Sequence, residues 1–303
     1  MREFCVKVPA TTANLGPGFD CIGMALQLYN SVKVELTEDK KIPLEIISRN
    51  NFHIPADETN LIYASIKRFY DEAGIGNLPP IRLTQDDKIP MTRGLGSSAA
   101  CIVAGLIAAN EISGLKLKKE DLAALAAKIE GHPDNCVPAI MGGVVVGAVT
   151  NGQLSFIKLY TGLFEQNNVS FAVCVPGFEL STELARKVLP EKYSRADAVF
   201  NVSHASLLTA ALANGDLSKL SAAMADKIHQ PYRSALVPNM TEIFEKANKL
   251  GAIGSFLSGA GPTIISLFTE HDFEKKMQSY LDTLPGGWQI FNLKLDYNGA
   301  VIE

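Results

Sequence analysis

The sequence is 303 residues long and has a formal net charge of −4, from 28 lysines and arginines against 32 aspartates and glutamates. This balance argues against a nucleic-acid-binding protein, which would carry a strong basic bias. The content of 47% hydrophobic and 20% charged residues excludes a disordered or fibrous chain. The length predicts about two domains.

No segment predicts a membrane span or an export signal. The longest mostly apolar stretch without a charge, residues 99–109, is shorter than the roughly 20 residues that a membrane helix needs. The N-terminus carries Glu3 and runs directly into strand-like alternation, unlike a signal peptide. The cysteines are scattered without a CxxC pair, which is typical of reduced, buried thiols. We therefore expect a cytoplasmic protein without a membrane partner.

Strand-like and helix-like segments alternate in the first half of the chain. Strand composition with partial alternation marks four segments: residues 5–9, 31–36, 44–48 and 81–84. Apolar residues at helical spacing predict three helices: residues 59–73, 98–112 and 118–130. The dipeptide Asn151-Gly152 lies between the apolar runs 143–149 and 154–159, and this pattern predicts a hairpin.

A polar, weakly periodic region at residues 160–168 indicates a junction between two domains, residues 1–160 and 161–303. The second half predicts a further set of strands, over residues 170–175, 253–257, 263–268 and 289–295. Its predicted helices cover residues 182–189, 196–213, 217–226, 240–249 and 273–284. Strands and helices in this order predict an α+β fold, with helices stacked on one side of a sheet.

The segment with the strongest chemical signal is residues 90–100, PMTRGLGSSAA, which opens directly into a helix. Glycines allow the backbone to approach a ligand closely, and the start of the helix offers free N–H groups and a positive dipole end. Such a loop suits the phosphates of a nucleotide. Ser98 can alternatively ligate Mg²⁺. Taken alone, the loop is also compatible with a tight turn capped by a serine.

A second polar cluster, Glu130-Gly-His132-Pro-Asp134-Asn135, follows the predicted end of a helix. Irregular backbone at this point can present several polar side chains together. The Glu130 carboxylate is a hard oxygen donor, which suits Mg²⁺ held beside substrate phosphates. Without the other motifs, the same residues would be ordinary turn material.

A glycine turn, residues 258–263 (SGAGPT), separates two apolar strands near the C-terminus. Such a turn is often purely structural. It can also bring backbone close to a second part of a ligand.

A fourth segment, residues 9–20 (PATTANLGPGFD), follows the first predicted strand and is expected to be a Gly/Pro loop. It carries Asn14 and Asp20, and polar loop residues on a rigid scaffold commonly bind ligands. An ordinary surface loop is the alternative.

The four segments in this order resemble the GHMP small-molecule kinases, a family that includes galactokinase, homoserine kinase, mevalonate kinase and phosphomevalonate kinase. The loop at residues 90–100 matches the family's nucleotide-loop signature, and SGAGPT matches its C-terminal glycine motif. The branch is indicated by residues 9–26, by GHPDN with Pro138 and Gly142-Gly143, and by residues 181–190 and 229–233, which resemble homoserine kinases. The resemblance covers nearly the whole chain.

The resemblance implies ATP-dependent phosphorylation of the side-chain hydroxyl of L-homoserine, on the route to threonine. It implies a two-domain α+β fold. The N-terminal domain would contain an unusual left-handed βαβ crossover, and the C-terminal domain would be ferredoxin-like. The resemblance also implies a homodimer that uses ATP and Mg²⁺.

The resemblance assigns site residues by position. The nucleotide side comprises Asn60, Arg93, Gly94, Leu95, Gly96, Ser97, Ser98, Ala99 and Ala100, with Asn60 near adenine. Ser98 and Glu130 would hold Mg²⁺ and, with Asn135, form the catalytic set. Homoserine would be surrounded by Asn14, Asp20, His132, Asn135, Thr182, Arg186, Arg233 and Gly259.

These substrate-side residues suit a zwitterion with one hydroxyl. Asp20 can take the ammonium group, and Arg186 and Arg233 can take the carboxylate with their planar forks. Related mevalonate-type enzymes use an aspartate as a base, for which Asp134 is the candidate here. We favour no protein base, with Asn135 orienting the hydroxyl, because positioning and charge stabilisation can carry phosphoryl transfer.

Two other functions remain open at this point. The first is a GHMP kinase with a sugar or mevalonate-like acceptor, against which two arginines and an acidic Asp20 argue. The second is a non-catalytic, ligand-sensing member of the family. The intact glycine loop, Ser98 and Glu130 argue against a sensor, which could lose its Mg²⁺ ligands.

Overall fold

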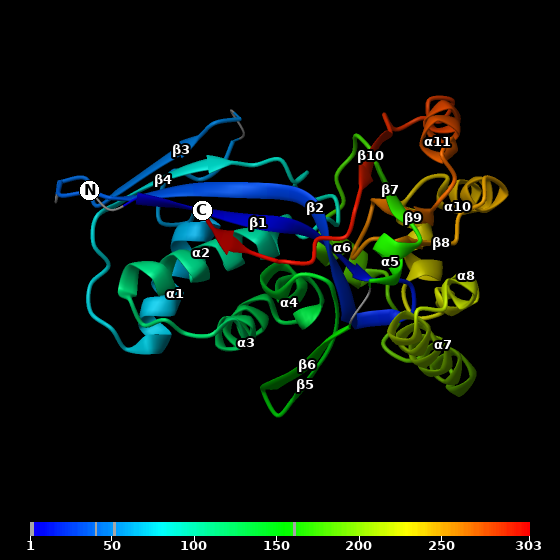
Figure 1. Cartoon of the computed structure of the whole chain (residues 1–303), viewed down its shortest axis with the longest axis horizontal. Coiled ribbons are helices and arrows are strands. Elements are labelled where there is room, and N and C mark those ends of the chain that lie inside the picture. Colours follow the sequence, from blue (N-terminus) through cyan, green and yellow to red (C-terminus); the bar gives the residue numbers. More distant parts are fainter. Residues whose placement is uncertain (1–2, 40, 51–52, 160–161) are drawn as a thin grey trace.

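The computed structural model describes residues 3–39, 41–50, 53–159 and 162–303, which form two β-sheets with helices packed against them (Figure 1). The first sheet has the order β11-β1-β2-β4-β3, and β5 pairs with β2 and with β6. Its strands are β1 (Glu3–Asn14), β2 (Gly18–Leu36), β3 (Leu44–Ser48), β4 (Ile81–Asp86), β5 (Val144–Thr150), β6 (Gln153–Leu159) and β11 (Val301–Ile302).

Helices cover one face of this sheet and enclose the first part of the core (Figure 1). They are α1 (Leu61–Ala73), α2 (Ser97–Ser113), α3 (Lys119–Glu130) and α4 (Pro133–Met141). Helix α2 is apolar around most of its circumference and is buried from Ala99 to Ala109 apart from Cys101. A helix of this composition belongs in the middle of a helical layer. The burial of the rest of the helix thereby holds its N-terminus, where Ser97 and Ser98 are not buried, at a set position.

The second sheet has the order β10-β7-β9-β8, with antiparallel pairing throughout. Its strands are β7 (Ser170–Val175), β8 (Gly254–Leu257), β9 (Ile264–Phe268) and β10 (Gln289–Leu293). Helices separate β7 from β8 and β9 from β10, so the strands lie in the order 4-1-3-2 of a βαββαβ unit. This arrangement confirms the predicted ferredoxin-like second half.

The helices of the second half lie around this sheet (Figure 1). They are α5 (Leu163–Gln166), α6 (Thr182–Lys187), α7 (Arg195–Asn214), α8 (Leu220–Ala223), α9 (Gln230–Arg233), α10 (Met240–Lys249) and α11 (Phe273–Leu281), with short 3₁₀ turns η1 (Leu217–Lys219) and η2 (Ser234–Leu236). Within the described residues, no helix is both long enough and apolar enough to cross a bilayer.

Two segments that were expected to be loops are regular structure. Strand β1 continues to Asn14 and pairs with β2 through two register shifts, so the 9–20 segment is a strand, a tight turn and the start of the next strand. Residues 133–141 form helix α4, with Pro133 at its first position and Asp134 in its first turn. Proline and an acidic residue are ordinary helix-start signals, and the expectation of a loop overlooked them.

The predicted domain boundary between residues 160 and 161 lies outside the described residues. The end of the chain, assigned to the second domain, returns to the first sheet: Val6 pairs with Ile302 and Lys7 with Val301 (Figure 1). A two-residue strand has no sequence pattern of its own, because its partner supplies its stability. Strands β3 and β4 pair in parallel around α1, and the left-handedness of that crossover stays a prediction.

Candidate active site

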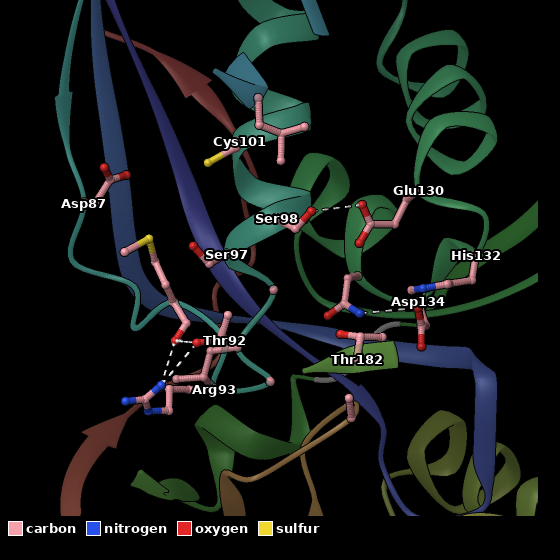
Figure 2. Close-up of a pocket in the computed structure, with 18 of the residues that line it drawn as sticks. Asp87, Thr92, Arg93, Ser97, Ser98, Cys101, Glu130, His132, Asp134 and Thr182 are labelled. Atoms are coloured by element: carbon pink, nitrogen blue, oxygen red, sulfur yellow. Dashed lines mark hydrogen bonds and ion pairs between the residues drawn. The ribbon is translucent and has the colours of Figure 1, made fainter. Parts of the chain in front are cut away.

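A pocket of about 340 Å³ lies where segments from both sheets meet. Its wall includes Asn14 at the end of β1, Asp20 on β2, the loop before α2, the α3–α4 junction, α6, α9 and residues 259–260. Figure 2 shows side chains from the start of α2, the α3–α4 junction and α6. The four sequence motifs therefore converge on a single cavity. Of the predicted site residues the following line it: Asn14, Asp20, Asn60, Arg93, Gly94, Leu95, Gly96, Ser97, Ser98, Glu130, His132, Asn135, Thr182, Arg186, Arg233 and Gly259.

The glycine loop is shaped by close contacts that exclude a side chain. Gly94 has φ 74°, and a Cβ there would lie 2.3 Å from the carbonyl oxygen of Ser258. Gly96 has φ 68°, and a Cβ there would lie 1.9 Å from Oγ1 of Thr11. Gly96 caps α2 without a side-chain hydrogen bond, so the first turn of the helix presents its N–H groups at the pocket. This is a site for an anion such as phosphate.

Two of the residues predicted to bind the nucleotide do not line the pocket. Ala99 and Ala100 are buried in the core beneath α2, and the backbone N–H of Ala100 donates to the carbonyl oxygen of Gly96. Their side chains pack within the helical layer because α2 is apolar on most sides. Ser98 is therefore the last residue of the 90–100 segment that lines the cavity.

Arg93 and Asn60 line the pocket but their polar groups are already engaged. The Arg93 guanidinium donates to the carbonyl oxygens of Pro176 and Gly177, which ties the glycine loop to the end of β7. The Asn60 side chain caps α1 by accepting from two backbone N–H groups, and its amide donates to the carbonyl oxygen of Pro55. The contact of Asn60 with adenine stays a prediction.

Ser98 and Glu130 face each other across the phosphate side of the pocket (Figure 2). The Ser98 hydroxyl donates to Oε2 of Glu130 at 3.5 Å. Burial raises the pKa of Glu130, and the neighbouring Asp134 charge raises it further. A half-buried carboxylate beside a hydroxyl oxygen is stabilised by a cation, and hard oxygen donors suit Mg²⁺. The two residues therefore fit the predicted metal.

The α3–α4 junction brings three polar side chains together. Asp134 is 3% exposed, and its carboxylate contacts Nδ1 of His132 and, at 3.4 Å, Nδ2 of Asn135. Burial opposes a charge on His132, but the hydrogen bond and charge of Asp134 outweigh it and raise the pKa of His132. The Thr11 hydroxyl donates to Oδ1 of Asn135 at 2.9 Å, so Nδ2 is the donor end of the amide; one of its N–H groups contacts Asp134, which leaves the second for a ligand in the pocket.

The far end of the pocket carries three charged side chains. Arg186 forms a two-pronged ion pair with Asp20, at 2.9 Å and 3.1 Å. Arg233 is 2% exposed and donates to three neutral acceptors: the carbonyl oxygens of Ala185 and Gly259 and Nδ1 of His229. No carboxylate of the described residues forms an ion pair with Arg233. Burial and the Arg186 charge lower the pKa of Arg233 to about 10, which still leaves it cationic at neutral pH.

Asp20 was predicted to take a ligand ammonium and Arg186 a ligand carboxylate. In the structure these two groups bond to each other. The contact spans 166 positions in the sequence, which is why separate roles could be drawn for them. Their pairing leaves Arg233 as a buried positive charge without an ionic partner among the described residues.

The structure also adds site residues that the sequence patterns did not single out. Asp87 and Gln85 line the pocket near Asn60, to which Gln85 donates a hydrogen bond, and Ile54, Pro55, Leu61 and Cys101 line it as well. Met91 and Thr92, within the 90–100 motif, also line it. Cys101 is an unreactive wall residue, because burial raises the pKa of its thiol to about 12. Thr11 and His229 lie behind the wall; both belong to segments that the motifs marked, residues 9–20 and 229–233, but neither was predicted as a site residue. Asp87, Gln85 and Cys101 had no sequence signal beyond nearness to a motif.

Models of two families of domains match the chain: the GHMP kinases N-terminal domain over residues 60–143 and the GHMP kinases C-terminal domain over residues 208–283. Curated homoserine kinases from Clostridium acetobutylicum and Caldicellulosiruptor saccharolyticus are each 44% identical to it. Both alignments cover 98% of this chain, and 99% and 96% of the two relatives.

Solved structures agree with these matches. The crystal structure of homoserine kinase from Cytophaga hutchinsonii superposes with a TM-score of 0.89 at 30% identity, covering 100% of this chain and 98% of that one. A mevalonate kinase structure has a TM-score of 0.72 at 17% identity, covering 97% and 99%, which shows the common fold alone. The chain therefore belongs to the GHMP kinase family, in its homoserine kinase branch.

Proposed function

We propose that the chain transfers the γ-phosphoryl group of ATP to the side-chain hydroxyl of L-homoserine, giving O-phospho-L-homoserine and ADP in threonine biosynthesis. The bond between the γ-phosphorus and the bridging oxygen of ADP breaks, a bond to the homoserine oxygen forms, and the hydroxyl proton is released. The observation that best supports homoserine as the phosphoryl acceptor is the buried cation of Arg233 at the far end of the pocket.

A buried guanidinium without an ionic partner is costly unless a ligand supplies the anion. Arg233 makes three hydrogen bonds to neutral acceptors and lines the cavity. A substrate carboxylate matches both the charge and the planar fork of an arginine. This feature favours an amino acid over a neutral sugar.

The ammonium group of homoserine distinguishes it from mevalonate, which has a carboxylate but no amine. Asp20 lies beside the pocket in its pair with Arg186, and the buried Asp134 carboxylate is near. Among the polar groups of Asp20, His132 and Asp134, one ligand atom from each lies within 4.8 Å of the others. This concentration of negative charge is suited to an ammonium, with Asn14, Thr182 and Gly259 completing the surroundings.

The ATP phosphates would lie on the glycine loop and the first turn of α2, with the base toward Asn60 and Asp87. Ser98 and Glu130 would hold Mg²⁺, which neutralises developing charge on the phosphates when bound. Ser97 adds a hydroxyl beside the same phosphates. The loop would supply orientation, and the half-buried carboxylate of Glu130 would supply the negative charge that retains the cation.

Phosphoryl transfer here would need no protein base. Asn135 presents Nδ2 because Thr11 occupies Oδ1, and an amide N–H donates to the acceptor oxygen rather than removing its proton. Asp134 also lines the pocket, but its carboxylate is engaged with His132 and almost fully buried. Positioning of the hydroxyl, together with charge stabilisation, carries the step. We also propose a cytoplasmic homodimer, on the resemblance to the family.

The proposal is tested by measuring ADP release with purified protein, ATP and Mg²⁺ and one acceptor at a time. Homoserine should give the highest kcat/KM, well above mevalonate, galactose and shikimate. Preference for mevalonate or a sugar would support a different kinase of the family. A protein that binds ATP and homoserine but releases no ADP would be a sensor.

A further inference from the structure

His229 lies behind Arg233 and touches it from within the fold. It is fully buried, and its Nδ1 lies 3.3 Å from Nη1 of Arg233. Its other ring nitrogen, Nε2, lies 2.8 Å from the carbonyl oxygen of Gly16 in the β1–β2 turn. The Phe19 ring stacks on the imidazole with centroids 5.3 Å apart, and the Arg233 guanidinium lies 5.3 Å from the same Phe19 ring.

These two contacts define the protonation state of His229. A guanidinium can only donate, so Nδ1 must be an unprotonated acceptor. A carbonyl oxygen can only accept, so Nε2 must carry the proton. Only the neutral Nε2–H tautomer satisfies both partners. A second proton would place an N–H donor against a guanidinium.

The charges around His229 allow this neutral form. Asp226 has a carboxylate oxygen 3.6 Å from Nε2, but that carboxylate also accepts from Asn201 and from the backbone N–H groups of residues 228, 229 and 230. Arg233 opposes a positive charge on the ring, and Asp20, paired with Arg186, lies farther off. Burial lowers the pKa of His229, and the Arg233 charge lowers it further, despite Asp226.

We propose that His229 is a positioning residue for the acceptor: its neutral imidazole accepts a proton of Arg233 and holds the guanidinium aimed at the substrate carboxylate. Nη1 of Arg233 also donates to the Gly259 carbonyl oxygen at 2.8 Å, and Nε donates to that of Ala185 at 3.1 Å. With Nε and Nη1 held from behind, the Nη2 group of Arg233 has no hydrogen-bond partner among the described residues and can meet the ligand. This inference rests on the proposed carboxylate-reading role of Arg233.

Two substitutions separate the two ring contacts. His229→Asn places an acceptor oxygen near the position of Nδ1 and gives up the bond to Gly16. His229→Gln places a donor near the position of Nε2 and gives up the acceptor for Arg233. We expect His229→Gln to raise KM for homoserine about tenfold, since a factor of ten corresponds to about 1.4 kcal/mol. His229→Asn should keep KM for homoserine within about threefold of wild type.

The measurement is KM and kcat with homoserine and with homoserine amide, which lacks the carboxylate charge, and KM for ATP. We expect His229→Gln to raise KM for homoserine much more than KM for homoserine amide, with KM for ATP unchanged. Equal impairment of both acceptors, or a larger defect in His229→Asn than in His229→Gln, would overturn it. If His229→Gln does not fold, the Asn variant decides: a selective loss of homoserine binding there contradicts the proposal, and retention supports it.

Arg233→Leu, assayed alongside, separates failure of this inference from failure of the proposed function. If Arg233→Leu raises KM for homoserine and for its amide equally, the carboxylate is bound by other residues and the proposed role of Arg233 fails. If Arg233→Leu impairs binding of homoserine more than binding of its amide, but His229→Gln impairs both equally, Arg233 binds the carboxylate without help from His229. Only the present inference then fails.

Discussion

Thr11 on β1 donates its hydroxyl proton to Oδ1 of Asn135 on α4, at 2.9 Å and across 124 residues of sequence. Thr11 is fully buried, and Gly96 packs directly against this pair, where a Cβ would collide with the Thr11 hydroxyl. Because Oδ1 accepts this proton, the contact identifies which end of the Asn135 amide is the oxygen and which is the nitrogen. It therefore connects the first strand, the glycine loop and the group proposed to orient the nucleophilic hydroxyl.

The Thr11 contact predicts a difference between two near-isosteric variants. Thr11→Val removes the hydroxyl that donates to Oδ1 of Asn135, so Asn135 loses the hydrogen bond that fixes its orientation. We expect kcat to fall about tenfold with KM for homoserine little changed, as a lost buried hydrogen bond costs about 1–3 kcal/mol. Thr11→Ser keeps the hydroxyl and should retain most of kcat. Steady-state kinetics of both variants check this, and equal kcat in Val and Ser variants would contradict it.

Glu130→Gln should lose most of kcat while the protein stays folded. The amide keeps the shape of the side chain but not the charge that would retain the proposed Mg²⁺ beside Ser98. The thermal midpoint of the variant without ATP should match or exceed that of wild type, because burial disfavours the Glu130 charge. Activity within about threefold of wild type would remove Glu130 from the metal site.

Asp134→Asn tests the absence of a protein base. A positioned general base typically contributes 10²–10⁴-fold, so a loss of kcat within about tenfold fits a mechanism without one. Asp134 is bonded to His132 and almost fully buried, which gives it a structural partner of its own. A larger loss of kcat, with an intact fold and unchanged KM for homoserine, would restore the aspartate-base mechanism.

Arg233→Leu should raise KM for homoserine at least tenfold and leave KM for ATP nearly unchanged. Removing one partner of a desolvated charge pair costs about 2–5 kcal/mol. KM for homoserine esters or amides should rise less in this variant than KM for homoserine does. Equal losses for charged and neutral acceptors would mean that Arg233 supports the fold rather than binding the carboxylate.

Stability should depend on pH through His229. Its folded pKa is lowered below the ordinary 6.5 by burial, so its contribution to stability is complete above that value and is lost as pH falls through the folded pKa. Asp226, Arg233 and the Asp20–Arg186 pair are the charged groups facing it. The thermal midpoint of wild type should therefore drop more between pH 7.5 and pH 5 than that of His229→Gln. An equal or smaller drop in wild type would contradict a neutral His229.

Local sequence signals were enough to predict the glycine loop and the order of strands and helices in the second half. The ferredoxin-like arrangement of those strands was implied by the resemblance to the GHMP kinases. Glycines at 94 and 96 before an apolar run predict a helix start, and β7 and α10 were predicted with the observed ends. Partnerships distant in sequence could not be predicted in this way. The pairing of Asp20 with Arg186 and that of β11 with β1 depend on how the two halves meet.

Local reasoning also failed where a signal had two meanings. His132-Pro133-Asp134 was interpreted as a turn, although proline and an acidic residue also begin helices, as they do in α4. Ala99 and Ala100 were predicted to lie at the nucleotide by motif position; their side chains are buried in the core, and a contact of their backbone with the phosphates stays a prediction.

The most direct measurement of the central claim is a competition. Purified protein with ATP and Mg²⁺ is given equal concentrations of homoserine, mevalonate, galactose and shikimate, and the phosphorylated products are identified by ³¹P NMR and mass spectrometry. The account predicts O-phosphohomoserine as the dominant product, formed in step with ADP. Dominant phosphorylation of another acceptor, or consumption of ATP without phosphohomoserine, would contradict it.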